Sequence, residues 1–181
     1  GMLNASYSYG GPNLAVRTIE RNFGIPIKGY VAVNFNAFKQ IINAVGGVHI
    51  TLTEREAKYL GFEPGYQLLN GSQALQYARL RKIDSDFQRN QRQRNIVNSV
   101  LSAMSSGGVD IYNAVNVALA NTRTNLNLRQ YVSTEYLSYT RRQLQLPAMS
   151  DTWKTYVRGM EVWPFKMANT HTKLVNFLTG K

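Results

Sequence analysis

The sequence predicts an α/β fold in which helices flank a mixed, partly parallel central sheet. Two β-rich segments, 30–35 and 48–52, enclose an apolar helical stripe at 38–45, and this order is typical of a βαβ crossover. A second stripe at 96–104 predicts another core-facing helix. Because parallel strands need such a crossover connection, the first pattern indicates two parallel strands.

Helix boundaries in the first third of the chain follow from glycine, proline and asparagine. Pro12 suits the first turn of a helix that Gly24 ends, and Asn36 is the expected N-cap of the next helix. Gly46 and Gly47 end that helix, because glycine tolerates a left-handed backbone. Segment 54–65 then predicts a short helix and a turn.

The remaining elements are less sharply bounded. Asp110 is the expected cap of a helix over 111–119. We find no internal repeat and no dividing linker, so we predict a single domain over residues 1–181. The other predicted elements are helices at 73–78, 128–142 and 174–178, and an edge strand on or beside 163–165.

Composition limits the possible functions. The chain has 21 Lys and Arg against 10 Asp and Glu, a formal net charge of +11, which favours nucleic acid, an anionic membrane or a phosphorylated substrate. A merely basic, soluble surface explains this charge at least as well. The absence of cysteine excludes disulfides and thiolate metal sites. Neither a serine-nucleophile motif nor a glycine-rich nucleotide loop is present.

Segment 77–94 concentrates basic residues just before the second apolar stripe. On a helical wheel, Arg89 and Gln93 fall on the inward face and Arg92 falls at its edge. If residues 79–81 are extended, Arg79 and Arg81 share one face; if they are helical, the two arginines diverge. Inward arginines near a helix start, where N–H groups are free, favour a phosphate site.

Two aspartates in the same segment leave a second interpretation open. Asp84 and Asp86 could pair with these arginines as a helix cap and a salt-bridge network. Outside this segment, Glu56 is expected to be solvated and His49 to lie on the surface.

The longest motif in the chain resembles the signature of the LytR-CpsA-Psr family. It consists of Leu69–Arg81, then Asp84, then Asp86–Arg89 with Arg92 and Gln93. Segments 7–12 and 44–48 also fit, and the resemblance fades after Gly108.

This resemblance implies a three-layer α-β-α sandwich outside the cell, anchored to the membrane of a Gram-positive bacterium in the full-length protein. It also implies a phosphotransferase. Such an enzyme moves a glycopolymer phosphate, for example of a teichoic acid or a capsular polysaccharide, from a polyprenyl-pyrophosphate carrier to peptidoglycan.

The resemblance also implies roles for particular residues. Asp86 and Arg89 are the predicted catalytic residues, with Asp86 near the reacting centre. A long apolar pocket, which we expect around Phe38, Ile41, Val97 and Val100, would hold the lipid. The predicted pyrophosphate-binding residues are Arg79, Arg81, Arg89, Arg92 and Gln93.

The family further implies Mg²⁺, whose ligands belong to an Asp/Arg motif on an earlier strand. We expect this chain to lack that N-terminal segment, and therefore to hold no complete metal site. The expected partners are the lipid-linked glycopolymer and peptidoglycan, with the membrane reached through the missing segment.

Two other functions compete with the transferase. One is a nucleic-acid-binding transcriptional regulator, against which the sequence shows no helix-turn-helix pattern, so we expect no specific nucleic acid partner. The other is a polyprenyl-phosphate-binding module without catalysis.

Overall fold

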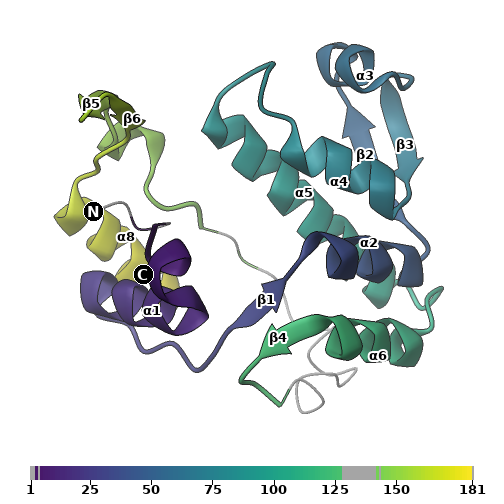
Figure 1. The fold of residues 1–181 in the computed structure, drawn as a ribbon, viewed down its shortest axis with the longest axis horizontal. Coiled ribbons are helices and arrows are strands. Elements are labelled where there is room, and N and C mark those ends of the chain that lie inside the picture. Colours follow the sequence, from purple (N-terminus) through teal and green to yellow (C-terminus); the bar gives the residue numbers. More distant parts are fainter. Residues whose placement is uncertain (1–2, 4, 128–141, 143, 181) are drawn as a thin grey trace. The chain divides into compact units, whose positions relative to one another are not determined.

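A computed structural model shows two compact units, which we describe separately (Figure 1). The central unit comprises residues 29–139, and the terminal unit comprises residues 1–28 with 140–181. The prediction of a single domain stays a prediction. The structure describes residues 3, 5–127, 142 and 144–180.

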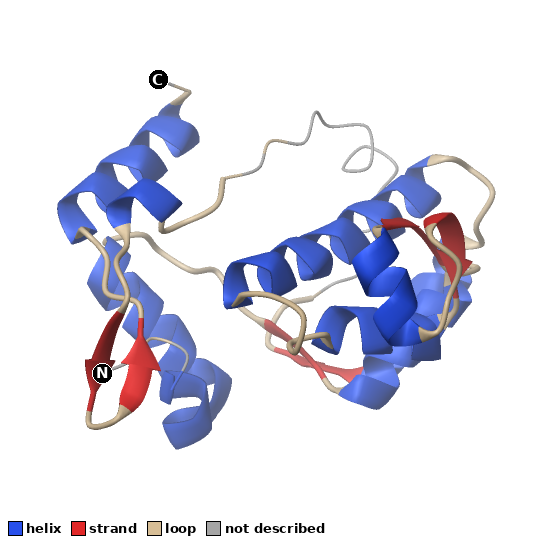
Figure 2. Ribbon diagram, turned by 90° about the horizontal axis from the view of Figure 1, so that it is seen from above, coloured by secondary structure: helices blue, strands red, loops and turns tan. Residues whose placement is uncertain are grey.

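The central unit alternates helices and short strands, which confirms the α/β class. Helix α4 packs against α2 and α5, and α5 also covers β2 (Figures 1 and 2). The elements in chain order are β1 (Val31–Val33), α2 (Phe35–Ala44), β2 (Val48–Leu52), α3 (Glu54–Leu60), β3 (Gly65–Leu69), α4 (Gly71–Arg79), α5 (Asp86–Ser105), α6 (Ile111–Asn121) and β4 (Thr122–Thr124).

Strand pairing differs from the predicted crossover. Strand β1 pairs with β4, and β2 pairs with β3, which was not predicted as a strand. Within the described parts of the chain every ladder is antiparallel. The prediction that 30–35 and 48–52 form a parallel pair is therefore wrong. The prediction failed because apolar patterning reveals a half-buried strand but carries no information about the strand with which it pairs.

The core of the central unit forms where β2 meets α2, α4 and α5. Along β2, alternate side chains point inward and leave His49 and Thr51 exposed, as the alternation predicts. The buried core residues are Ile42, Val48, Ile50, Leu52, Ala57, Leu69, Ala74, Tyr77, Ala78 and Ile96.

Helix starts in this unit depend on asparagine caps. Helix α2 begins two residues earlier than expected, because Asn34 and not Asn36 accepts the hydrogen bond from Ala37 N, at 2.8 Å. At the start of α4, a Cβ on Gly71 would lie only 2.2 Å from the backbone oxygen of Lys39. Glycine is therefore required for α4 to pack this closely on α2.

The terminal unit combines two helices with a hairpin. Helix α1 is kinked at Gly10 and Gly11 and becomes regular again at Pro12, where the sequence predicts a helix start. The predicted helix at 128–142 falls almost wholly outside the described residues. None of the helices that the structure describes is long and apolar enough to cross a membrane. The elements are α1 (Ala5–Phe23), η2 (Met149–Asp151), β5 (Thr155–Val157), β6 (Met160–Val162) and α8 (Met167–Thr179).

Candidate functional site

The basic segment runs from the end of α4 into a turn that leads to α5. Arg79 is the last residue of α4, and Leu80 is extended and buried. Arg79 and Arg81 are both exposed, on either side of buried Leu80. Because Arg79 is still helical and only Leu80 is extended, neither alternative holds over all of 79–81, but both arginines line the same hollow and can serve one ligand.

An open hollow of about 420 Å³ lies at this end of α4. Three of its lining residues are cationic, and others are apolar or aromatic. Such a lining suits an anion that carries an apolar group. The lining residues are Tyr59, Leu60, Gln76, Arg79, Leu80, Arg81 and Lys82.

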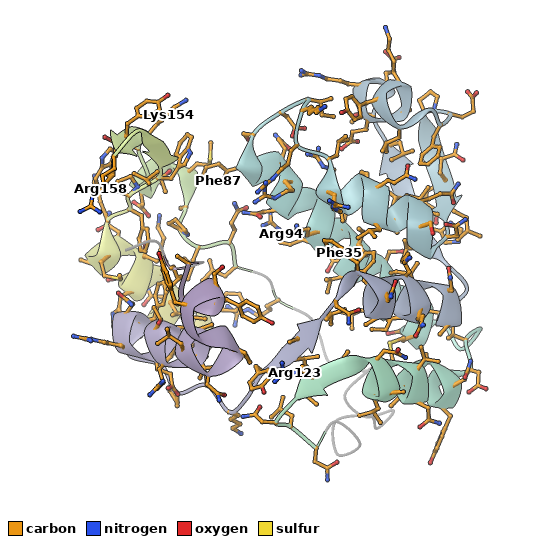
Figure 3. All side chains as sticks on the ribbon, viewed as in Figure 1. Phe35, Phe87, Arg94, Arg123, Lys154 and Arg158 are labelled. Atoms are coloured by element: carbon orange, nitrogen blue, oxygen red, sulfur yellow. The ribbon has the colours of Figure 1, made fainter. Side chains whose placement is uncertain are left out.

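Arg79 is oriented by an aromatic ring from a neighbouring helix. Its guanidinium carbon lies 4.7 Å from the ring centroid of Phe35, at the start of α2. Figure 3 labels Phe35, which is itself 58% exposed. A cation–π contact at an exposed site contributes about 0.5–1 kcal/mol, which is enough to favour one orientation but too little to hold Arg79 away from a phosphate.

Arg92 is the centre of a buried ion network beneath this hollow. Its two terminal nitrogens lie 2.7 and 2.6 Å from the carboxylate oxygens of Asp84, and one of them also lies 3.1 Å from Glu56. The other donates to the backbone oxygen of Leu80 at 2.8 Å. Because Leu80 separates the two arginines of the hollow, Arg92 fixes the segment that carries them.

The charges in this network stabilise one another. The hydrogen bond from Arg92 lowers the pKa of Asp84, although partial burial opposes the shift. The pKa of Arg92 is correspondingly raised, first by its bond to Asp84 and despite its own burial. The alternative that Asp84 pairs structurally with an arginine is thus correct for Arg92.

Glu56 is buried, so the prediction that it is solvated is wrong. Its carboxylate accepts hydrogen bonds from the backbone N and the hydroxyl of Thr53, at 3.0 and 2.9 Å, and from Arg92. The sequence did contain a sign that the Glu56 side chain turns back to the start of α3, because Thr53-Glu54-Arg55-Glu56 has the spacing of a capping box.

Asp84 gives this network a defined pH dependence. Its folded-state pKa is depressed below the ordinary value, so its stabilising contribution is present above about pH 4 and disappears as the pH falls through the folded value. We expect the melting temperature of the wild type to fall more steeply below pH 4 than that of Asp84→Asn. Asp110→Asn, at an exposed helix cap, is the control. Parallel melting curves for wild type and Asp84→Asn would contradict the pairing.

The predicted inward face of α5 is right at Ile96 and Val100 but wrong at its start, where Arg92 and not Gln93 is buried. Arg92 is 2% exposed and Ile96 is buried, whereas Gln93 is exposed and Val97 is 57% exposed. Both faces fit a period of 3.6 residues over so short a stretch, so the wheel could not separate them. Since its terminal nitrogens are held by protein acceptors, the geometry does not support Arg92 as a pyrophosphate ligand.

The other predicted site residues are only partly brought together. Arg89 is half-buried on α5, and it does not line the hollow. Asp86 begins α5, but its side chain lies outside what the structure describes. Lys82 joins Arg79 and Arg81 in the hollow and was missed, although it follows Arg81 directly in the basic segment.

The predicted lipid pocket stays a prediction. Phe38 and Val100 pack against the core, and neither of the two hollows that we describe is lined by them or by Ile41 or Val97. Periodicity could not distinguish core from pocket. The second hollow, of about 310 Å³, is lined by Asn43, Gly46, Gly47, Leu68, Asn70 and Gln73.

The described residues do not form a magnesium site. Among them, no group of three or more His, Asp or Glu side chains is close enough together to hold a metal ion. Asp84 faces Arg92, and Asp110 caps α6. Mg²⁺ therefore stays a prediction from the family resemblance.

Comparison with known proteins decides the family. Residues 1–173 match the family model described as the LytR_cpsA_psr family. The chain belongs to the LytR-CpsA-Psr family.

Its relatives in this family include named transferases. The chain is 36% identical over 156 residues to the polyisoprenyl-teichoic acid–peptidoglycan teichoic acid transferase TagV of Bacillus subtilis, an alignment that covers 78% of this chain and 40% of TagV. The chain thus spans about two fifths of the length of such relatives.

Solved structures of the family share the fold. The crystal structure of Bacillus subtilis TagV matches with a TM-score of 0.75 and 29% identity, over 98% of this chain and 74% of that one. A structure of TagT bound to LIIa-WTA matches with a TM-score of 0.78 and 24% identity, over 96% of this chain and 70% of that one. At that identity, the TagT match shows the fold alone.

The LytR-CpsA-Psr motif Leu69–Arg81 separates into structural and chemical parts. Gly71 permits the close packing of α4 on α2. Tyr77 is 1% exposed and its hydroxyl accepts a hydrogen bond from an α5 asparagine at 3.2 Å. Arg79 and Arg81 form the chemical part of the motif, because both are exposed in the hollow and do not pack in the core.

Proposed function

We propose that this chain is the pyrophosphate-recognising part of a cell-wall glycopolymer phosphotransferase. The observation that carries the proposal is the hollow, in which Arg79, Arg81 and Lys82 lie beside Tyr59 and Leu60. The cations suit a diphosphate, and the apolar side chains suit the first carbons of a polyprenyl chain. This substrate class is supported by the relatives, which are named as transferases of polyisoprenyl-teichoic acid.

In the proposed reaction, a peptidoglycan hydroxyl attacks the phosphorus that bears the glycopolymer. A new P–O bond forms, the bond from that phosphorus to the bridging oxygen breaks, and polyprenyl phosphate leaves. Asp86 takes the proton of the hydroxyl, and Arg89 neutralises charge on the transferred phosphate. Arg79 and Arg81 hold the departing phosphate. Gln93 remains a proposed ligand at the edge of this site.

Other parts of the proposal rest on family membership. Mg²⁺ is the proposed cofactor, with ligands from outside the described residues, and no step above passes through it. The proposed location is outside the cell, with the full-length protein anchored in the membrane. Peptidoglycan is the proposed acceptor.

A transfer assay tests this function. The full-length protein is incubated, with Mg²⁺, with a labelled saccharide on polyprenyl pyrophosphate and with purified peptidoglycan. We expect label in the peptidoglycan and an equal amount of polyprenyl phosphate, measured by mass spectrometry. Binding without transfer would support the non-catalytic module instead. Equal affinity for polyprenyl pyrophosphate and for the uncharged polyprenol would contradict both interpretations.

Duplex DNA provides a test of the regulator alternative. We expect only weak binding at physiological salt, with the same affinity for a candidate promoter and a scrambled duplex, because the net charge of +11 attracts phosphate without reading sequence. Fluorescence anisotropy measures both affinities. Tight binding that depends on sequence would overturn the transferase proposal.

A further inference from the structure

The terminal unit presents aromatic and basic side chains on one small hairpin. We call residues 153–163, which contain β5 and β6, the aromatic hairpin. Trp153, Tyr156 and Trp163 are 48%, 63% and 38% exposed, and Val157 is 51% exposed. This is a large apolar exposure for an eleven-residue segment, and such exposure marks an interaction surface.

The base of the hairpin is held firmly by the helices of the same unit. The buried carboxylate of Asp151 accepts hydrogen bonds from Lys173 Nζ at 2.6 Å and from Asn169 at 3.0 Å, both on α8. Phe165 stacks on Phe23 of α1 with ring centroids 6.3 Å apart. The exposed side chains therefore stand on an ordered base within the terminal unit.

The register of β5 and β6 places aromatic and basic side chains together on one face of the hairpin. Thr155 pairs with Val162, and the bridge between Thr152 and Phe165 continues the same register. Lys154 therefore lies across from Trp163, and Tyr156 follows Lys154 on the same face. The Lys154 ammonium lies 5.6 Å from the ring centroid of Tyr156.

The tip of the hairpin adds another cation. Arg158 and Gly159 form a two-residue turn with φ values of +51° and +76°, as in the tight turns that favour Asn-Gly. Arginine is a poor residue for this left-handed conformation, so its presence puts a charge at the tip against local preference. Figure 3 shows Lys154 and Arg158 extending outward from the hairpin.

We propose that the aromatic hairpin docks on an anionic phospholipid surface. The aromatic hairpin contains two basic residues, Lys154 and Arg158, and a single acid, so its small net positive charge complements anionic headgroups. Tryptophan and tyrosine are the side chains that favour the bilayer interface, and Lys and Arg reach past them to phosphates. Val157, at the tip on the opposite face of the hairpin, is also exposed, and an apolar tip favours acyl chains over a saccharide ring.

The chain carries its own probe for this contact, because Trp153 and Trp163 are its two tryptophans. We expect the tryptophan emission to shift to shorter wavelength with mixed phosphatidylcholine–phosphatidylglycerol vesicles and to stay unchanged with phosphatidylcholine alone. Lipids brominated on the acyl chain should quench it. Vesicle titration gives the apparent Kd.

Two variants test the charges without disturbing the fold. Arg158→Asn removes a cation and places at the tip a residue that tolerates the left-handed turn, so its stability should be unchanged or higher. Lys154→Gln removes the second cation of the hairpin. Each charge lost should weaken vesicle binding roughly fivefold, and the double variant should weaken it about 25-fold. Arg123→Ala, an exposed cation of the central unit, is the matched control and should bind like the wild type.

Aromatic burial is tested separately. Tyr156→Ser should weaken vesicle binding, whereas Tyr112→Ser, at an 81% exposed tyrosine on α6, should not. No emission shift with anionic vesicles would overturn the proposal, as would equal binding by Arg158→Asn/Lys154→Gln and the Arg123→Ala control. A shift produced by soluble peptidoglycan fragments or by poly(glycerol phosphate), but not by vesicles, would show a glycan site instead and would also overturn it.

Discussion

Replacement of Arg92 by alanine is expected to lower the free energy of unfolding of the central unit by about 3–5 kcal/mol. The substitution would leave the carboxylates of Asp84 and Glu56 without the cation that faces both. It would also remove the hydrogen bond to the backbone oxygen of Leu80. A buried charge without its partner is costly, so this loss should exceed that of any exposed arginine.

Urea unfolding followed by circular dichroism measures this effect. Tryptophan fluorescence does not report on it directly, since both tryptophans belong to the terminal unit. Arg92→Lys should lose part of the stability, because an ammonium cannot form the paired bonds of a guanidinium to Asp84. Arg123→Ala is the control for loss of one positive charge. A change below about 1 kcal/mol for Arg92→Ala would show that the network is not a structural anchor.

Elements with a strong local signal were predictable from the sequence. The stripe at 96–104 lies in α5, Asp110 caps α6, and the final helix forms as α8. Each depends on side chains within one or two turns of each other, which is the range over which periodicity and capping act. The identification of the family rested on the same local motif, Leu69–Arg81, and is confirmed.

Long-range choices were not predictable from these patterns. The partner of β1 is β4, about 90 residues away, and no local pattern specifies that pairing. The choice between Arg92 and Gln93 as the buried residue of α5 was decided by Asp84 and Glu56, which meet Arg92 from a turn and from another helix. The composition of the basic segment allowed both a ligand site and an ion network. The structure shows the network around Arg92 and, separately, the exposed cations of the hollow.

Loss of both hollow arginines is expected to have the largest effect on ligand binding. Arg79→Ala/Arg81→Ala should weaken binding of polyprenyl pyrophosphate by at least about 100-fold, because charge-assisted hydrogen bonds contribute roughly 1.5–3 kcal/mol each. Both side chains are exposed, so the melting temperature without ligand should stay close to that of the wild type.

Isothermal titration with a short-chain polyprenyl pyrophosphate measures the affinity, and the matching polyprenol shows the contribution of the lipid alone. The double variant should bind the two compounds almost equally. Lys28→Ala/Arg123→Ala, which removes the same charge from exposed positions outside the hollow, should keep the preference of the wild type for the pyrophosphate. If the double variant kept that preference, the pyrophosphate would have to lie elsewhere on the chain. Arg89→Ala would then be the decisive variant, because Arg89 is the predicted phosphate-binding arginine that lies outside the hollow and outside the Arg92 network.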